Sequence, residues 1–362
     1  MLKKLLSILA AILMILLLPS CGSDSADETE PEYYSATFFA MDTEVTVRLA
    51  RNTGRTDEEE NAVYFDDEHL SEIVKNCADI ASEKELILSR TDEKSSLYEL
   101  NGEADFYLNI DPEISQLISY SKEISEKTGG AFDITVGTVT ELWNVTGESP
   151  KVPSEEEVAE ALSHVGNDKI ALNETNLTKN DRNTKLDLGA IGKGYTLGKI
   201  IDYLKTTDVL YGVVSFGGNV GVFGNKETGN GFKVGITDAL NKDKVCGYVY
   251  TESDFVSVSG DYERFFTSDG KKYSHIFDPL TGKPAESDIT GVAVICSDSS
   301  LADALSTALF VKGSEKALEF YKSEVYTFEA VIQKKDGEIV LTDGLKGGKF
   351  EKYTEPETST AE

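Results

Sequence analysis

Apolar residues recur every three or four positions in several segments, which is the spacing of an amphipathic helix. Residues 112–128 begin with Asp111 and Pro112, a favourable helix start. Residues 154–166 open with a Ser-Glu-Glu-Glu capping box. We expect helices in these two segments and also in residues 68–82 and 301–309.

Runs of β-branched and aromatic residues lie between the helical segments and predict strands. The predicted strands are residues 38–49, 209–215, 220–223, 232–237, 247–252, 255–258, 290–296 and 328–333. The last is joined through Asp336-Gly337 to residues 339–342 as a hairpin. Because this order has no strict βαβ rhythm, we expect a mixed sheet with covering helices.

The N-terminus is typical of an exported protein. Lys3 and Lys4 precede an uninterrupted apolar run over residues 5–18, which is long enough for a signal peptide and short for a membrane span. The run leads to Cys21 in a sequence similar to a bacterial lipobox. We expect a signal peptide over residues 1–20 and a lipid on Cys21; a plain secretory signal and a retained anchor helix are the alternatives. Each places the rest of the chain outside the cytoplasm, on the outer face of the membrane if the lipid anchor forms.

Polar segments delimit the expected folded part. Residues 21–32 form an acidic tether and residues 351–362 a disordered tail, which leaves residues 33–350 as one folded domain. We expect residues 51–67, which are also acidic and polar, to form an exposed insertion within it.

The net charge limits the kinds of partner that the chain can bind, and the cysteine spacing limits the possible disulfides and metal clusters. The chain has 35 Lys and Arg against 64 Asp and Glu, a net charge of −29. This balance argues against binding to nucleic acid or to anionic lipid through a basic surface. Cys77, Cys246 and Cys296 are an odd, widely spaced set, so we expect buried apolar residues rather than disulfides or a metal cluster.

Asp303 and Thr307 are the first candidates for chemistry. They are four residues apart in a predicted helix, so their oxygens point to one face, whereas Leu301, Leu305 and Leu309 form a separate apolar stripe. Two hard oxygen donors suit a cation such as Mg²⁺. The alternative is a half-buried amphipathic helix in which both side chains make local hydrogen bonds.

Five segments rich in glycine or turn residues lie between the predicted elements: residues 129–137, 186–195, 215–219, 259–264 and 275–282. In the second, a strand leads into a helix start, where backbone amides, the helix dipole and Lys193 favour an anion. It is not a Walker loop, because the spacing before Lys193 is wrong. A single such segment is usually only a turn, but five together indicate a ligand site.

His275 is the histidine with a functional context. It directly precedes an Asp-Pro-Leu-Thr-Gly turn, whereas His69 and His164 lie on predicted helix surfaces beside acidic residues. Proton transfer or ligand contact by His275 is therefore as well supported as a structural role.

These segments, together with Met41-Asp42-Thr43, resemble the ApbE family of FAD:protein FMN transferases from about residue 38 to residue 342. The resemblance implies an α+β fold of the ApbE, T-fold-like type, with mixed sheets and covering helices in two interlocked subdomains and an FAD site between them. It also implies Mg²⁺-dependent transfer of FMN from FAD to a Thr or Ser hydroxyl of an exported or membrane redox protein, with release of AMP.

The resemblance also implies roles for individual residues. The backbone carbonyl of Ala190 and the side chains of Asp303 and Thr307 would hold the metal. His275 would accept the proton of the attacking hydroxyl, and Asp303 would be catalytic through the metal. The residues expected to contact FAD are Met41, Ala131, Phe132, Asp133, Lys193, His275 and Ile276.

Some positions depart from the family pattern. Asp42 replaces a usual Gly, Gly192 a common Ala and Ser215 a frequent Asn, and Thr91 lies where an aromatic residue often stacks on FAD. Two other activities are compatible with the sequence. One is a pyrophosphatase that splits FAD into FMN and AMP, and the other is a non-catalytic flavin-binding lipoprotein.

Overall fold

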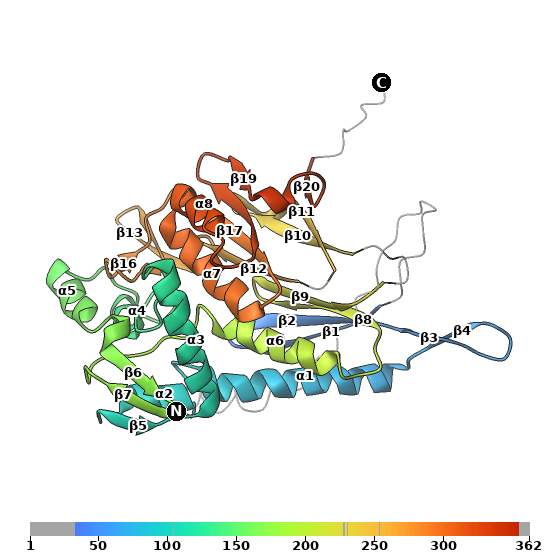
Figure 1. Ribbon diagram of the computed structural model, residues 1–362, viewed down its shortest axis with the longest axis horizontal. Helices are drawn as coiled ribbons and strands as arrows, with labels where there is room; N and C mark the ends of the chain where they lie inside the picture. Colours follow the sequence, from blue (N-terminus) through green and yellow to red (C-terminus); the bar gives the residue numbers. More distant parts are fainter. Residues whose placement is uncertain (1–32, 104, 227–228, 230, 253, 355–362) are drawn as a thin grey trace.

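The computed structural model describes residues 33–354 except 104, 227, 228, 230 and 253 (Figure 1). The predicted signal peptide, Cys21, the tether up to residue 32 and residues 355–362 of the tail lie outside the described residues. In the described part of the chain, none of the helices combines the length and the apolar character needed to cross a membrane.

An eight-stranded sheet forms the centre of the molecule, and all of its neighbouring strands pair antiparallel. In sheet order, its strands are β1 (Tyr33–Ala40), β2 (Thr43–Ala50), β8 (Tyr211–Phe216), β9 (Asn219–Gly224), β12 (Phe255–Gly260), β17 (Ile289–Cys296), β18 (Glu329–Lys334) and β19 (Ile339–Leu341). Every residue of β17 is buried, so both faces of the sheet are covered there.

Helices cover one face of this sheet and a second sheet covers the other. The helices are α1 (Asp67–Leu88), α6 (Gly192–Leu204), α7 (Ser299–Lys312) and α8 (Ser314–Lys322) (Figure 1). The second sheet contains β10 (Phe232–Asp238), β11 (Asn241–Thr251) and β20 (Phe350–Lys352). Alternate residues of β17 serve the two cores, because Val292 and Val294 pack on the helical side and Ala293 and Ile295 on the other.

A smaller lobe lies at the end of the helical layer. Its helices are α2 (Ser96–Gly102), α3 (Pro112–Thr128), α4 (Gly137–Trp143) and α5 (Glu155–Ser163). They accompany a sheet of β5 (Tyr107–Asn109), β7 (Asn176–Lys179) and β6 (Ile170–Asn173). Three hairpins extend from the body: β3–β4 (Asn52–Thr56, Ala62–Tyr64), β13–β14 (Phe265–Ser268, Lys271–Ser274) and β15–β16 (Phe277–Asp278, Lys283–Pro284). The α+β prediction is therefore confirmed.

The single strand predicted over residues 38–49 is wrong. The chain reverses at Met41 and Asp42, which have φ angles of 49° and 57°, and β1 and β2 pair on either side of that turn. Hairpin turns with two positive φ angles usually contain Gly or Asn, and neither residue is present at positions 41 and 42 to indicate the turn. In contrast, the hairpin predicted at Asp336-Gly337 is confirmed, with Gly337 at φ 85° between β18 and β19.

Helix α7 and strand β20 also differ from what the sequence predicted. Helix α7 is buried on nearly every side, because it packs against β12, β17 and α6, so it is not the half-buried helix considered as an alternative. Strand β20 includes residues 351 and 352, which the sequence assigned to the disordered tail. The three cysteines are free and buried, as expected, and burial raises the pKa of the Cys77 thiol to about 12.

Candidate active site

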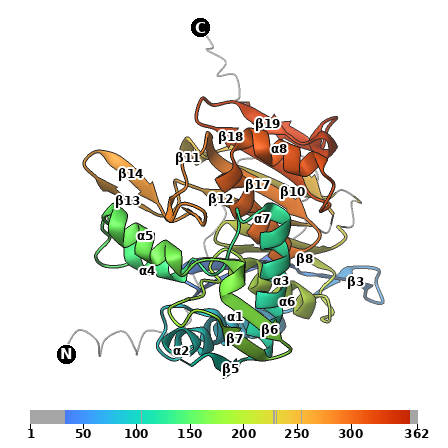
Figure 2. The same cartoon turned by 60° about the vertical axis from the view of Figure 1, so that its left-hand side comes forward.

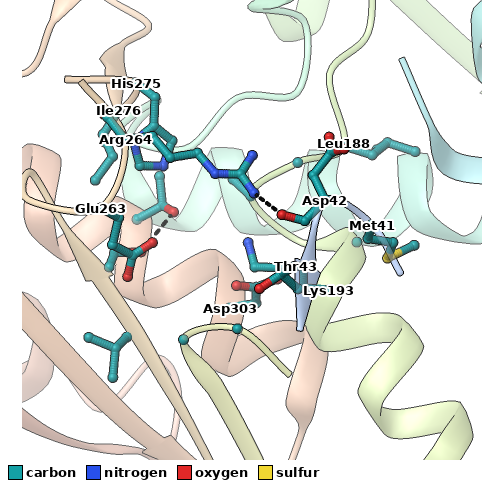
Figure 3. A pocket seen from close by; sticks show the side chains of 18 of the residues that line it. Met41, Asp42, Thr43, Leu188, Lys193, Glu263, Arg264, His275, Ile276 and Asp303 are labelled. Atoms are coloured by element: carbon teal, nitrogen blue, oxygen red, sulfur yellow. Dashed lines mark hydrogen bonds between the residues drawn. The ribbon is translucent and has the colours of Figure 1, made fainter. Parts of the chain in front are cut away.

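A pocket of about 730 Å³ lies where the central sheet, α6, α7 and the smaller lobe meet, and its size suits a nucleotide-sized ligand. Figure 3 shows Glu263, Arg264 and His275 on one side, Met41 and Asp42 on the opposite side, and Lys193 and Asp303 between them. All candidate metal and FAD residues line this pocket: Met41, Ala131, Phe132, Asp133, Ala190, Lys193, His275, Ile276, Asp303 and Thr307. The structure thus brings together residues from five separate segments, and their individual roles stay predictions.

Asp303 has a buried carboxylate that two layers of the fold hold in place. Asp303 is only 3% exposed to solvent. Oδ2 accepts a hydrogen bond of 2.8 Å from the Gly194 amide in the first turn of α6, and Oδ1 lies 3.2 Å from the Ser257 hydroxyl of β12. The same hydroxyl lies 2.5 Å from Oδ1 of Asn219 in β9, so its single proton faces both acceptors. The carboxylate is therefore fixed in position before any ligand arrives.

The donors around Asp303 are oxygen atoms. Thr307 lies one helical turn further along α7, and its hydroxyl is 3.3 Å from that of Ser259. The described residues contain no group of three or more His, Cys, Asp or Glu side chains that could hold a metal. A cation at Asp303 would therefore need hydroxyl, carbonyl and ligand oxygens to complete its shell. Such a donor set fits Mg²⁺, which commonly binds through one or two carboxylates plus substrate phosphates.

The loop that carries Ala190 is held by side chains from the smaller lobe and from the segment that follows α1. The Asn101 amide both accepts from the Leu186 N–H at 2.7 Å and donates to the Leu186 carbonyl at 2.8 Å. Asp187 accepts from the Gly189 N–H at 2.8 Å and pairs with Arg90 at 3.4 Å. These bonds fix the loop that leads into α6, whose N-terminus carries Lys193 into the pocket. An anion is favoured at that helix end.

His275 is held as a neutral base. Its backbone N–H donates to the Arg264 carbonyl, and its Nδ1 lies 3.0 Å from the same oxygen. A carbonyl oxygen only accepts, so Nδ1 carries the proton and Nε2 keeps a free lone pair. Burial, reinforced by the nearby charge of Lys193, lowers the pKa of His275 to about 4. The side chain is therefore able to accept a proton at neutral pH.

Glu263 and Arg264 are pocket residues to which the sequence assigned no role, although they lie in one of the five turn-rich segments. Arg264 donates to the Asp42 carbonyl at 3.2 Å and so connects the two sides of the pocket (Figure 3). Glu263 has a solvent-accessible side chain, but protein atoms surround the pocket in which it lies, and this desolvation raises its pKa. Asn219 and Ser257 were also missed as a pair, because their link to Asp303 depends on strand pairing between β9 and β12.

The remaining candidates form the walls of the pocket. Phe132 and Ile276 are almost fully buried, so they shape the wall from within the core. Asp133 accepts from both the amide and the hydroxyl of Thr135, and burial raises its pKa. Met41 accepts a weak hydrogen bond from Thr196 at 3.6 Å. Thr91 lines the pocket together with Ser89 and Arg90.

The sequence model of the ApbE family matches residues 41–332, which includes every segment that lines the pocket. The chain belongs to the ApbE family. It is 32% identical to the FAD:protein FMN transferase of Treponema pallidum over 66% of this chain and 70% of that protein. It is 26% identical to the FAD:protein FMN transferase of Haemophilus influenzae over 98% and 99% of the two chains.

Solved structures of ApbE proteins share the fold. The ApbE protein of Thermotoga maritima superimposes with a TM-score of 0.76 at 32% identity, covering 87% of this chain and 98% of that one. The ApbE flavinyl transferase of Pseudomonas stutzeri gives a TM-score of 0.72 at 25% identity, covering 88% and 98%. These matches establish the ApbE fold for this chain.

The lowered pKa of His275 predicts a pH-dependent contribution to stability. Folding favours neutral His275, so its contribution is present above its ordinary pKa of 6.5 and is lost as the pH falls from there toward 4. The difference in free energy of unfolding between the wild type and His275→Asn should therefore become less favourable to the wild type between about pH 7 and about pH 5. Urea denaturation at both pH values measures this, and an identical difference at the two would contradict the assignment.

Proposed function

We propose that this chain transfers FMN from FAD to a Thr or Ser hydroxyl of an acceptor protein in a Mg²⁺-dependent reaction that releases AMP. The observation that carries the proposal is the placement of a buried carboxylate, Asp303, and a neutral histidine, His275, in one nucleotide-sized pocket. The general activity, FAD:protein FMN transfer, follows from membership of the ApbE family, because the relatives described above are named FAD:protein FMN transferases.

Asp303, Thr307 and the Ala190 carbonyl are the residues that would hold Mg²⁺. When bound, the cation neutralises charge that develops on the pyrophosphate, which is usually the dominant contribution in phosphoryl transfer. Lys193 at the N-terminus of α6 adds a positive charge on the same side of the pocket. We assign Met41, Ala131, Phe132, Asp133 and Ile276 to the walls around the nucleotide.

The reaction needs a proton acceptor for the attacking hydroxyl. The hydroxyl oxygen forms a bond to the phosphorus on the FMN side of the pyrophosphate, and the bond from that phosphorus to the bridging oxygen breaks. AMP leaves with the bond electrons, and the hydroxyl proton moves to Nε2 of His275. The Arg264 carbonyl stabilises the imidazolium that results, because it accepts a hydrogen bond from Nδ1–H.

We further propose that the enzyme works outside the cytoplasm, anchored by a lipid at Cys21, on exported or membrane redox proteins. The support is the N-terminal sequence, which is typical of a bacterial lipoprotein signal. A reaction whose energy comes from the pyrophosphate of FAD needs no separate supply of ATP. This suits an extracytoplasmic enzyme.

Intact-mass spectrometry distinguishes transfer from the pyrophosphatase and from simple binding. Incubation of the enzyme with FAD, Mg²⁺ and candidate exported redox proteins should increase the mass of one acceptor by FMN less one water. The increase should need both FAD and Mg²⁺, and AMP should appear in equal amount. Free FMN and AMP without any labelled protein would identify a pyrophosphatase, and unchanged FAD would identify a binding protein.

Replacement of His275 tests its role as the proton acceptor. His275→Asn should lower kcat for transfer by about 100-fold, while the Kd for FAD changes by less than about threefold, because a proton acceptor acts mainly on the chemical step. His164→Asn is the matched control, since His164 pairs with Asp181 at 2.7 Å and does not line the pocket. Equal losses in rate and in FAD binding for His275→Asn would make His275 a binding residue instead.

A further inference from the structure

The hairpin β13–β14 is a direct extension of the active site. Its first strand follows Arg264, and its second strand ends immediately before His275. The bond from the His275 N–H to the Arg264 carbonyl, 3.0 Å long, closes the base of the hairpin. The hairpin projects from the body of the molecule (Figure 2). A partner that lies along it would therefore reach His275.

One face of the hairpin is anchored to the smaller lobe. Phe266 stacks on its cross-strand neighbour Tyr273, with ring centroids 5.2 Å apart, and Tyr273 lies 5.5 Å from the Trp143 ring. The Trp143 indole N–H donates to the Gly282 carbonyl at 2.9 Å. These contacts hold the hairpin in a defined orientation relative to the pocket.

The opposite face carries an exposed aromatic ring between two lysines. By strand register, Phe265 and Lys272 share this face, since Phe265 pairs with Ser274 and Lys272 is two residues from it. The Phe265 side chain is 45% exposed. Lys272 Nζ lies 4.6 Å and Lys242 Nζ 5.9 Å from its ring centroid, and Lys242 also lines the pocket. We call Phe265, Lys242 and Lys272 the Phe265 rim.

The charge of the rim is opposite to that of the chain as a whole. With a net charge of −29, the protein repels an acidic partner at most approaches. At the rim, two ammonium groups flank an exposed ring beside the pocket mouth. Lys272 is also 3.0 Å from Asp261, and Lys242 donates to the Tyr262 carbonyl, so both are held near the ring. This combination attracts carboxylates and offers apolar contact to a neighbouring side chain.

The hairpin also offers backbone groups to an extended chain. Within the described residues, β13 and β14 form a sheet of two strands, so each has one edge without a neighbouring strand. An extended peptide can pair with such an edge through main-chain hydrogen bonds. The edge leads toward Arg264 on β13 and toward His275 on β14.

We propose that the Phe265 rim binds an extended, acidic segment of the acceptor protein and delivers its Thr or Ser hydroxyl to His275. This inference rests on the proposed transferase activity and adds the surface that selects the acceptor. In this proposal FAD occupies the pocket, which Lys242 also lines, whereas Phe265 and Lys272 lie outside the pocket lining and contact the acceptor.

A peptide library with a fixed central Thr and randomised positions on both sides tests this surface. After incubation with enzyme, FAD and Mg²⁺, mass spectrometry identifies the peptides that carry FMN. Wild-type enzyme should label peptides enriched in Asp and Glu relative to the input library. For the most strongly labelled acidic peptide, Lys272→Glu should lower kcat/KM by about fivefold and leave the Kd for FAD unchanged.

Lys271→Glu is the matched control, because it makes the same charge change one residue away on the opposite face of the hairpin. It should alter kcat/KM much less than Lys272→Glu. Equal effects of the two variants, or labelled peptides without acidic enrichment, would contradict the proposed role of the Phe265 rim. Neither result would contradict the proposed FMN transfer. A weaker affinity of Lys272→Glu for FAD would show that the rim contributes to FAD binding and not to acceptor binding. Absence of labelling by the wild type, with FAD still bound, would overturn the proposed transfer itself and the rim with it.

Discussion

The close crossing of α6 and α7 at Gly194 is the contact on which the site depends. A Cβ atom at this position would lie 2.3 Å from the Ser299 carbonyl oxygen and 2.6 Å from the Asp303 Cβ, so only glycine allows the two helices to approach this closely. At this distance, the Gly194 N–H reaches the Asp303 carboxylate. The same crossing therefore packs the helical layer and aims the carboxylate into the pocket.

Burial gives Asp303 a strong requirement for a positive partner. A carboxylate removed from water is costly unless hydrogen bonds and an opposite charge compensate it. Gly194 and Ser257 supply hydrogen bonds, yet none of the ion pairs in the described part of the chain involves Asp303. A divalent cation held by Asp303 would supply the missing positive charge. In the proposed function, the charge of this site would be completed only when metal and FAD are both bound.

The candidate metal-binding and proton-accepting residues could be predicted from the sequence, because short sequence patterns identify them. The spacing of Asp303 and Thr307, and the turn after His275, identified side chains that the structure places in one pocket. The turn at Met41-Asp42 lacked the usual residues, and the links from Asn219 and Ser257 to Asp303 join positions up to 84 residues apart. Such contacts arise from strand pairing and helix packing, which local patterns do not specify.

The coupling between metal and FAD at Asp303 is the central claim. Calorimetric titration of FAD into the protein, with and without Mg²⁺, measures it directly for the wild type and for Asp303→Asn, which keeps the shape of the side chain but removes its charge. Mg²⁺ should tighten FAD binding to the wild type by about tenfold and should leave binding to the variant unchanged. An equal effect of Mg²⁺ on both proteins would show that Asp303 does not hold the cation.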